Sequence, residues 1–494
     1  MLSAAACVKI NHIYRRFGGI KMRKTKIVCT LGPSTDDKET LRAMILAGMD
    51  VARLNFSHGS HEEHKKRADL IKALRAEMNV PLALMIDTKG PDIRVGRFFD
   101  NFQELRTGDS FTLTTGECLG DMTRASVTYA ELPKKLTLGD TVMLDDGLIE
   151  LRVESCTDTE VVCTVINGGI IANNKSLNVP GVKLDIPYMR EKDIEDINFA
   201  IDNGFDYVAA SFVRSYDDVW QVRKILEERG ASDIKIISKI ENSEGIENIA
   251  EIMAVSDSIM VARGDMGVEI PFFDLPSVQK ELIKKAMKAG DKVITATQML
   301  ESMIKNPRPT RAEVSDVANA IYDGTSAIML SGETSVGRFP VETVRTMAQI
   351  AEVTERDIDY RKRFMQLDWD FPTESFIDAI SHSICSTAYK LKNATILVLT
   401  IEGMTARLIS RYRPAGGFVA FTHDPKVYNQ LSLNWGCVPM LMEQSNDLDF
   451  IFKTAVEKAK EAGLVSRGDT VVFTGSVPAG ASGGSHKMQI AVVN

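Results

Sequence analysis

Short runs rich in aliphatic and β-branched residues recur along this chain with helical stretches between them, and this recurrence limits the folds open to it. Within each group of runs the starts lie about 23 to 35 residues apart, the repeat length of a strand plus a returning helix. Eight such units are typical of a closed (β/α)8 barrel. We predict barrel strands at residues 26–32, 50–57, 81–88, 207–213, 235–241, 258–265, 292–298 and 327–334.

The long interval between the third and fourth runs has a different pattern, with alternating polar and apolar residues and turn signals such as Asp-Asp-Gly. It leaves the barrel at the end where active sites of such barrels lie, so we interpret it as an all-β lid. The predicted α/β organisation has five segments. They are a basic N-terminal extension (1–22), a (β/α)8 TIM barrel in two parts (23–90 and 186–358), the inserted β lid domain (91–185) and a C-terminal α/β domain of regulatory type (359–494).

Composition excludes several classes of protein. The 494 residues are 44% hydrophobic and 26% charged, which is close to the globular average and argues against a disordered or fibrous chain. The sequence contains no apolar run long enough for a membrane span, and the net charge of -8 argues against a general nucleic-acid binder. Seven cysteines, none in a Cys-x-x-Cys pair, suit reduced thiols and predict a cytoplasmic enzyme.

The start of the chain is basic, with seven Lys and Arg and no Asp or Glu before residue 36. A leader of this kind resembles a transit peptide, but it has one Ser before Met22 and no convincing amphipathic run. We interpret it as an extension upstream of Met22, with a targeting segment as the alternative.

Within each predicted strand the polar residues occupy alternate positions. Because successive side chains of a strand point to opposite faces, these polar residues lie on the same face. In the second run, Arg53 and Asn55 alternate with Leu54 and Phe56. Charged side chains on one barrel rim would be buried without compensation unless a ligand or metal shares the site. The polar residues with this placement are Arg53, Asn55, Ser57, Lys239, Glu241, Arg263, Asp265, Thr295, Thr297, Ser331 and Glu333.

The chemical types of these residues indicate a metal-assisted site for anions. Glu241 and Asp265 offer hard oxygen ligands suited to Mg2+, which completes its shell with water and substrate oxygens. Arg53 and Lys239 supply positive charge to an anion beside that metal. The segment 262–267 offers backbone N–H groups to a carboxylate. A second, all-oxygen cluster fits a monovalent cation and consists of Asn55, Ser57, Asp87 and Thr88.

At these residues the chain resembles the pyruvate kinase family, from about Arg23 to its end. The resemblance rests on residues 26–34 (KIVCTLGPS), 52–59 (ARLNFSHG), 87–94 (DTKGPDIR), 237–241 (ISKIE), 262–267 (ARGDMG), 295–303 (TATQMLESM) and 330–334 (LSGET). It implies a barrel, an inserted lid and a C-terminal regulatory domain, assembled as a homotetramer. It also implies phosphoryl transfer from phosphoenolpyruvate to ADP with Mg2+ (or Mn2+) and K+ as cofactors, and no nucleic-acid or membrane partner.

The same resemblance implies a role for each matching residue. Arg53 would bind the transferring phosphoryl group, Lys239 would stabilise it, and Glu241 and Asp265 would hold Mg2+. Such a site suffices because phosphoryl transfer needs positioning and charge neutralisation more than covalent help. The other implied roles are K+ ligation by Asn55, Ser57, Asp87 and Thr88, contact with the ADP phosphates by Arg94 and Lys175, binding of the carboxylate and enolpyruvate by Gly264, Asp265 and Thr297, and proton relay by Ser331 and Glu333.

Two positions depart from the family pattern. Asp92 stands where K+-dependent members have Glu and K+-independent members have Lys, so its charge favours K+ dependence. Glu402 replaces a hydroxyl residue in the stretch 400–405, which aligns with the family's phosphate-binding loop, and a carboxylate there repels a sugar phosphate. The loop at 475–487 also lacks the Trp and Arg of activated relatives. We therefore expect weak or no activation by fructose 1,6-bisphosphate.

Other interpretations stay open at this point. A catalytically idle metabolite sensor on the same fold is the main alternative, although no substitution in the site predicts inactivity. Another barrel enzyme acting on an enol would not need both a K+ cluster and lid cations. His58, His61 and His64 have the spacing of a metal cluster, but residues 60–63 form a helix capping box, so we expect His61 and His64 on a solvated first turn.

Overall fold

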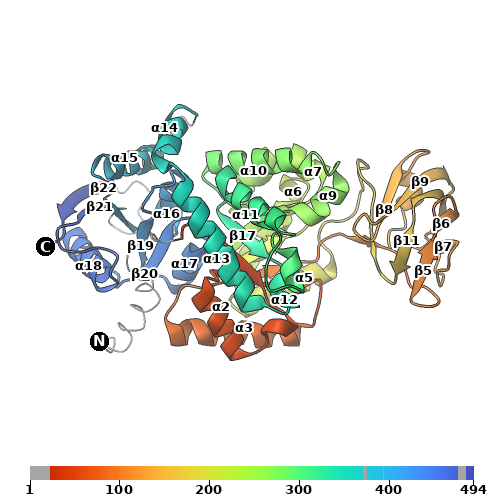
Figure 1. Ribbon diagram of the computed structural model, residues 1–494, viewed down its shortest axis with the longest axis horizontal. Coiled ribbons are helices and arrows are strands. Elements are labelled where there is room, and N and C mark those ends of the chain that lie inside the picture. The colour runs from red at the N-terminus through yellow and green to blue at the C-terminus, as the bar shows by residue number, and fades with distance from the viewer. Residues whose placement is uncertain (1–22, 371–374, 393, 477–485) are drawn as a thin grey trace.

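The computed structural model describes residues 23–370, 375–392, 394–476 and 486–494. The basic extension at residues 1–22 and most of the loop at 475–487 lie outside the described residues, together with the predictions made for them. Three bodies follow one another along the long axis of the molecule, with a barrel in the middle and the C-terminal domain and the β lid at opposite ends (Figure 1). Among the described helices, none combines the length and apolarity needed to cross a bilayer.

The central body is a closed parallel barrel with the strand order β1-β17-β16-β15-β14-β13-β3-β2, which confirms the predicted (β/α)8 fold. Most strands end one to four residues before the predicted end, so several of the polar residues assigned to strands lie in the loops or helices that follow. The strands are β1 (Lys26–Thr30), β2 (Val51–Asn55), β3 (Ala83–Asp87), β13 (Tyr207–Ala210), β14 (Lys235–Ile240), β15 (Ser258–Ala262), β16 (Lys292–Ala296) and β17 (Ala327–Leu330).

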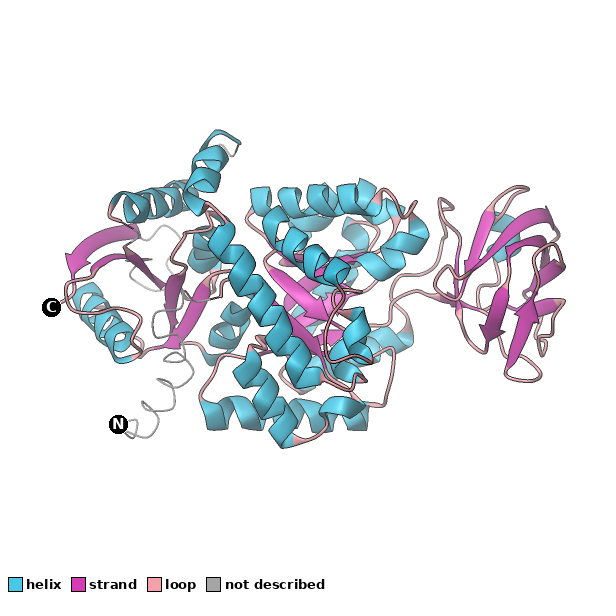
Figure 2. Ribbon diagram, in the orientation of Figure 1, coloured by secondary structure: helices cyan, strands magenta, loops and turns pink. Residues whose placement is uncertain are grey.

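Helices surround the barrel strands (Figure 2). Outward-facing strand residues such as Leu54 and Ile240 pack in the layer between strands and helices, whereas Val51 and Ile237 fill the barrel interior. The larger helices are α2 (Lys38–Ala47), α3 (His61–Met78), α5 (Glu191–Asp202), α6 (Tyr216–Glu228), α8 (Ile249–Val255), α10 (Leu275–Ala289), α11 (Arg311–Asp323) and α13 (Pro340–Asp357). Short helical turns are η1 (Pro33–Thr35), α7 (Ser243–Glu247), α9 (Arg263–Glu269), η2 (Glu301–Ile304) and α12 (Gly332–Ser335).

The lid leaves the barrel after β3 and returns before α5, and it has its own apolar core. One sheet has the order β4-β12-β8-β9-β10-β6-β7, and β5 pairs with β11 in a second. Its elements are β4 (Ile93–Arg94), β5 (Phe102–Leu105), β6 (Ser110–Thr114), β7 (Arg124–Ser126), α4 (Leu132–Lys135), β8 (Thr141–Leu144), β9 (Ile149–Cys156), β10 (Glu160–Asn167), β11 (Gly169–Ala172) and β12 (Ser176–Asn178).

The C-terminal domain is a sheet with the order β20-β19-β18-β21-β22, in which only the last pair is antiparallel. The sequence predicts strands in this domain at residues 394–400, 417–422, 469–474 and 488–493, and it does not predict β20. Leu433 reaches from this domain into the barrel interior cluster and closes the base of the barrel. The elements are α14 (Tyr360–Asp370), α15 (Phe376–Lys390), β18 (Thr395–Leu399), α16 (Met404–Arg411), β19 (Phe418–Thr422), α17 (Pro425–Gln430), η3 (Leu431–Leu433), β20 (Cys437–Leu441), α18 (Leu448–Glu461), β21 (Thr470–Ser476) and β22 (His486–Val492).

Candidate active site

Asp87, at the end of β3, lies between the two cations predicted to bind the phosphoryl group. Its carboxylate accepts a hydrogen bond from Arg53 Nε at 2.7 Å and one from Lys239 Nζ at 3.1 Å. Arg53 Nη1 donates to Thr30 Oγ1 at 2.7 Å, so residues from the two neighbouring strands, β1 and β3, hold the guanidinium. Asp87 is 1% exposed, Arg53 7% and Lys239 8%, and the group is therefore a buried ion-pair network at the C-terminal rim of the barrel.

Two residues that follow β13 complete this network, and the sequence prediction missed both. Ser211 Oγ accepts from Lys239 Nζ at 2.7 Å and donates to the Thr88 carbonyl oxygen at 2.7 Å. The Phe212 N–H donates to Glu241 Oε2 at 2.6 Å, and Phe212 has a positive φ of 54°. A bulky residue in this backbone region is rare and is often found at functional sites. No sequence signal marked either residue, because each acts through partners on other strands.

Burial and neighbouring charges set the protonation of this cluster. Burial alone would lower the pKa of the Lys239 ammonium, but Asp87 and Glu241 raise it, so Lys239 is charged. Burial opposes ionisation of Asp87, yet Arg53 and Lys239 lower its pKa. Burial raises the pKa of Glu241 to about 7, opposed by Lys239 and reinforced by Asp265, and burial also raises the pKa of Asp265.

Lys239 offsets the effect of burial on the two carboxylates only in part, so the pair of Glu241 and Asp265 would be stabilised by further positive charge. A divalent cation bound by both carboxylates would supply that charge, and hard oxygen donors are the ligands that Mg2+ prefers. Within the described residues, no cluster brings together three or more Asp, Glu, His or Cys side chains suited to a metal ion. A cation held here would therefore complete its coordination shell with water and substrate oxygens.

The prediction that Arg263 and Asp265 share one face of a strand is wrong. Strand β15 ends at Ala262, and both residues lie in helix α9 (Arg263–Glu269). The Arg263 guanidinium turns away from the rim, where it donates to the Thr297 carbonyl oxygen at 2.6 Å and pairs with Asp316 at 2.7 Å. Asp265 joins Glu241 because the chain turns into a helix immediately after the strand.

The structure also separates the residues predicted on the last two strands. Thr295 is fully buried and donates to Thr325 Oγ1 at 2.9 Å, outside the barrel interior. Thr297 has a φ of 74° and packs against Gly264 in α9. A Cβ atom added at Gly264 would lie only 2.9 Å from Thr297 Cγ2. Close packing there requires Gly264 to lack a side chain.

Glu333 lies behind the rim rather than on it. It is fully buried in α12, and its carboxylate accepts from the Leu300 N–H at 3.1 Å and from the Ser331 N–H at 2.7 Å. Both acceptor oxygens are thus occupied by backbone groups of the loops after β16 and β17. The Glu333 carboxylate therefore holds the backbone of Ser331 in place.

A cavity of about 440 Å³ lies between the barrel rim and the lid. Arg53, Lys239, Glu241 and Asp265 line it from the barrel, together with Asn55 and Ser57 of the predicted K+ cluster. The lid contributes Arg94, Asp146, Ser176, Asn178 and Lys183. Thr297, Ser331, Glu333, Gly264, Asp87, Thr88 and Lys175 are not part of its wall. The cavity therefore joins the barrel cations and carboxylates with one of the two predicted lid cations.

Asp92, at the hinge of the lid, gathers three basic side chains. Its carboxylate pairs with Arg94 at 2.5 Å, Arg190 at 3.1 Å and Lys89 at 3.2 Å. Burial opposes ionisation, but these cations lower the pKa of Asp92. Lys175, at the other hinge, pairs with Asp145 at 2.7 Å and is 42% exposed. Both lid cations are therefore held by an acidic partner beside the cavity.

The four residues predicted to bind K+ lie together. Asn55 and Asp87 are opposite each other in the β2–β3 register, and the Thr88 carbonyl follows directly. The Asn55 Oδ1 atom accepts from the Ser57 N–H at 3.1 Å, which folds the end of β2 back on itself. The donor set is entirely oxygen and neutral apart from Asp87, a chemistry suited to a monovalent cation.

The histidine prediction needs a correction. Ser60 and Glu63 form the predicted capping box of α3, but His64 is 2% exposed rather than solvated. Its ring stacks on Phe56 with centroids 4.0 Å apart, and Nε2 lies 2.8 Å from the His58 carbonyl oxygen. His64 is buried because the next turn of α3 packs against the barrel layer, which the local capping pattern does not reveal.

Comparison with known proteins identifies the family. A model described as "Pyruvate kinase, barrel domain" matches residues 22–344, and "Pyruvate kinase, alpha/beta domain" matches residues 378–491. The chain belongs to the pyruvate kinase family. Pyruvate kinase of Clostridium acetobutylicum is 46% identical over 473 residues, covering 96% of this chain and 100% of that protein. Pyruvate kinase of Staphylococcus aureus is 48% identical over 474 residues, covering 96% of this chain and 81% of that protein.

A solved structure supports the same assignment. The crystal structure of a pyruvate kinase from Cryptosporidium parvum is similar with a TM-score of 0.91 and 37% sequence identity, covering 100% of this chain and 98% of that one. The resemblance inferred from the sequence motifs is therefore confirmed, as is membership in a family of phosphotransferases. A barrel enzyme of another family acting on an enol is excluded.

Proposed function

We propose that this chain transfers the phosphoryl group of phosphoenolpyruvate to ADP, giving pyruvate and ATP. Support comes chiefly from the buried network of Arg53, Asp87 and Lys239 beside the carboxylates Glu241 and Asp265. Ion pairs join Arg53 to Asp87, Asp87 to Lys239 and Lys239 to Glu241 at a rim that the lid faces. A catalytically idle sensor has no need of this arrangement, so the geometry favours the enzyme.

In this mechanism Arg53 and Lys239 bind the transferring phosphoryl group. Asp87 holds both cations in place at the rim. Glu241 and Asp265 would hold Mg2+ (or Mn2+), which supplies charge neutralisation to phosphoryl and carboxylate oxygens when bound. The fixed positive charge of Lys239 stabilises negative charge on the group in transfer.

Lid residues bind the second substrate. Arg94 and Lys175 are assigned to the ADP phosphates, whose oxygens would replace the carboxylates of Asp92 and Asp145 as partners. Asn178 on the lid donates to Glu269 of α9 at 2.8 Å, a bond that brings the lid towards the rim. Closure of the lid would exclude water and protect the transferring group from hydrolysis.

The enolpyruvate end is assigned to the first turn of α9 and the loops after β16 and β17. Gly264, Asp265 and Thr297 bind the carboxylate and the enol oxygen, and Gly264 lies directly against Thr297 at this end of the rim. Ser331, oriented by Glu333, relays the proton that converts the enolate into pyruvate.

Three further assignments are proposed on the strength of the family resemblance. Asn55, Ser57, Asp87 and Thr88 hold K+, and the acidic charge of Asp92 nearby favours dependence on that cation. The chain assembles as a homotetramer and acts in the cytoplasm. Light scattering on the purified chain tests the tetramer, and titration of activity with K+ against tetramethylammonium tests the cation requirement.

A coupled assay of the full chain tests the proposed function. With phosphoenolpyruvate, ADP and Mg2+, we expect one ADP consumed for each pyruvate released. Omission of K+ is expected to reduce the rate, whereas replacement of Mg2+ by Mn2+ is expected to preserve it. A folded chain that binds phosphoenolpyruvate without releasing pyruvate would instead support the idle sensor.

A further inference from the structure

Phe212, in the loop that follows β13, combines a bulky side chain with a left-handed backbone. Its φ is 54°, and it is the only aromatic residue with a positive φ among those that the structure describes. Asn and Asp tolerate this region, whereas a phenylalanine there is strained and persists only where its surroundings hold it in place. Two contacts hold Phe212, one made by its backbone and one by its ring.

The backbone contact is made with a carboxylate of the candidate metal site. The Phe212 N–H donates to Glu241 Oε2 at 2.6 Å, while Glu241 Oε1 lies 2.9 Å from Lys239 Nζ. Glu241 is 0% exposed, and it lines the cavity between the rim and the lid. A hydrogen bond to a ligating carboxylate orients it towards its metal. The Phe212 N–H therefore sets the direction in which this carboxylate faces the cavity.

The ring of Phe212 packs on the residue from which the lid departs. Gly90 lies between β3 and β4, the first strand of the lid. A Cβ atom added at Gly90 would lie 3.1 Å from Phe212 Cδ2 and 3.0 Å from the Ser211 carbonyl oxygen. Gly90 also has a φ of 69°, so the close approach and the backbone both require glycine at this position.

Gly90 is also the point at which the two connections of the lid meet. Its N–H donates to Asp193 Oδ1 at 3.0 Å, and its carbonyl oxygen accepts from Arg190 Nη2 and, at 3.1 Å, from the Asp92 N–H. Arg190 is the N-cap residue of α5 and Asp193 lies in its first turn, where the chain has returned from the lid. Gly90 therefore joins the departing and returning chains, and Phe212 lies against this hinge.

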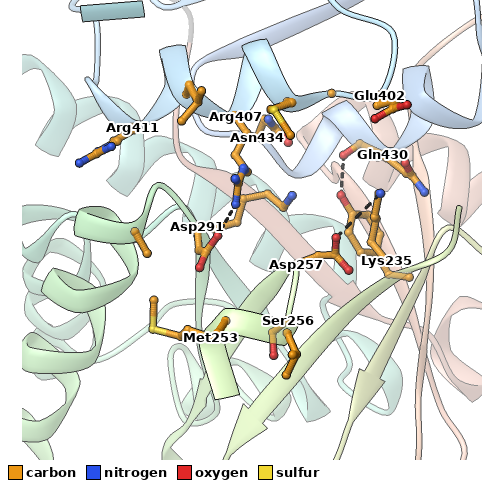
Figure 3. A pocket seen from close by; sticks show the side chains of 18 of the residues that line it. Lys235, Met253, Ser256, Asp257, Asp291, Glu402, Arg407, Arg411, Gln430 and Asn434 are labelled. Carbon is orange, nitrogen blue, oxygen red and sulfur yellow. Dashed lines mark hydrogen bonds and ion pairs between the residues drawn. The ribbon is translucent and has the colours of Figure 1, made fainter. Parts of the chain in front are cut away.

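The C-terminal domain does not impose the strain at Phe212. Phe212 lines the cavity between the rim and the lid. A larger cavity of about 1050 Å³ lies at the opposite end of the barrel, beneath the C-terminal domain, and Phe212 is not part of its wall. Figure 3 shows that cavity, in which Arg407 of α16 turns towards Asp291 of the barrel. The strain at Phe212 therefore arises at the rim and the hinge.

From these contacts we propose that Phe212 is a positioning residue that couples the Glu241 carboxylate to the hinge of the lid. This inference rests on the proposed function, in which Glu241 binds a divalent cation and the lid binds ADP. A shift of the carboxylate moves the Phe212 N–H, and the rigid ring passes that shift to Gly90 and to Arg94 beyond it. Coupling of this kind is reciprocal, so a change at the hinge alters the affinity of Glu241 for the cation.

Titration of the substrate-free full chain with Mn2+ tests the coupling without catalysis, with free Mn2+ measured by electron paramagnetic resonance. Phe212→Gly keeps the N–H and relieves the backbone but removes the ring. We expect it to weaken Mn2+ binding about tenfold, at the lower end of the usual effect of a partner that orients a metal ligand. Phe212→Tyr keeps the ring and should bind Mn2+ as the wild type does. Unchanged Mn2+ affinity in Phe212→Gly would overturn the proposal.

Two matched controls account for the relieved backbone and for the lost ring. Asn79→Gly relieves a left-handed residue with nearly the same φ, 53°, at the C-cap of α3. Phe99→Gly removes an exposed ring of the lid that lies outside both cavities. Both variants should bind Mn2+ with wild-type affinity. A loss in either variant as large as that in Phe212→Gly would count against a specific role for Phe212.

Gly90→Ala tests the same coupling from the side of the hinge. The added methyl group would press on the Phe212 ring, so Mn2+ binding should weaken although the substitution lies at the hinge. In the double variant with Phe212→Gly the ring is absent, and Mn2+ should bind no more weakly than it binds to Phe212→Gly alone. Additive losses would show that the hinge acts on Glu241 by another route and would contradict the proposal.

Steady-state kinetics separate this role from the proposed reaction. At saturating Mn2+, Phe212→Gly should recover the wild-type KM for phosphoenolpyruvate but keep a raised KM for ADP, because the contact with the hinge stays lost. Recovery of both constants would contradict coupling to the lid. If the Mn2+ titrations follow these expectations while the wild-type chain releases no pyruvate, the coupling stands and the proposed reaction fails.

Discussion

Replacement of Lys239 by Met tests the buried network at the barrel rim. The ammonium lies 3.1 Å from Asp87 Oδ1, 2.9 Å from Glu241 Oε1 and 2.7 Å from Ser211 Oγ. Methionine fills similar volume but removes the charge and all three contacts. Asp87 then retains only Arg53 as a cationic partner, and Glu241 loses the one group that lowers its pKa most.

The expected loss follows from these distances. At an effective dielectric constant of about 20, two unit charges about 3 Å apart attract by about 5 kcal/mol, and burial removes most of the screening by water. Desolvation of the lysine offsets part of this attraction, and Glu241 can take up a proton when its partner is lost. We therefore expect a loss of stability of about 3 to 5 kcal/mol, as for other broken buried ion pairs. The loss of charge at the transferring group should lower kcat by at least about two to three orders of magnitude.

The measurement combines steady-state pyruvate release with chemical denaturation and near-UV circular dichroism. Lys239→Arg keeps the charge and is expected to fold with an intermediate rate. Lys224→Met removes a surface lysine paired with Glu228 at 3.7 Å and should change neither quantity. A folded Lys239→Met protein with the wild-type kcat would refute the role assigned to this residue.

Three other substitutions probe the neighbourhood. Ser211→Ala should lower kcat about tenfold and stability by about 1 to 2 kcal/mol, because the acceptor that positions the lysine is lost; Ser211→Thr should restore both. Gly264→Ala should raise the KM for phosphoenolpyruvate with a smaller effect on kcat, since the new methyl group would lie 2.9 Å from Thr297 Cγ2. Burial raises the pKa of Asp206 to about 6 although Arg75 lies at 3.1 Å, so the folded state holds this proton more tightly. The contribution of this carboxyl to wild-type stability should therefore fall by about 3 kcal/mol from about pH 4 to pH 6. Asp206→Asn should flatten that decline in denaturation measured across the same pH range.

Each of these expectations has a clear contrary result. Unchanged kinetics in Ser211→Ala would show that the lysine is positioned without it. An unaltered KM in Gly264→Ala would place the phosphoenolpyruvate carboxylate away from this helix turn. A stability profile of Asp206→Asn that still declines between about pH 4 and pH 6 would assign the pH dependence to another group.

The barrel was predictable from the sequence because its signal is local and repeated. Each strand turns apolar residues outward to the helices, and each strand–helix unit has nearly the same length, so spacing and periodicity mark all eight. The alternation of polar and apolar residues predicted the correct face on β2 and β14, where Arg53, Asn55 and Lys239 occupy positions that face the barrel interior. It failed at β15, because Arg263 begins a helix one residue after the strand ends.

The C-terminal domain contains features that local sequence patterns do not predict. Strand β20 (Cys437–Leu441) escaped prediction because it contains Pro439 and has only five residues, although it is held by its pairing with β19. The burial of Leu433 in the barrel interior was equally invisible, since its partners lie hundreds of residues earlier in the chain.

The sequence by itself determined the fold class, the family and the chemical types that the rim presents, because these depend on residue identity and on spacing along the chain. Tertiary structure decided which groups pair. Asp87 is held between Arg53 and Lys239, and Ser211 supports the lysine, only because barrel closure brings four strands together. Electrostatic energy depends on distance in space and on burial, and neither quantity is recorded in local sequence.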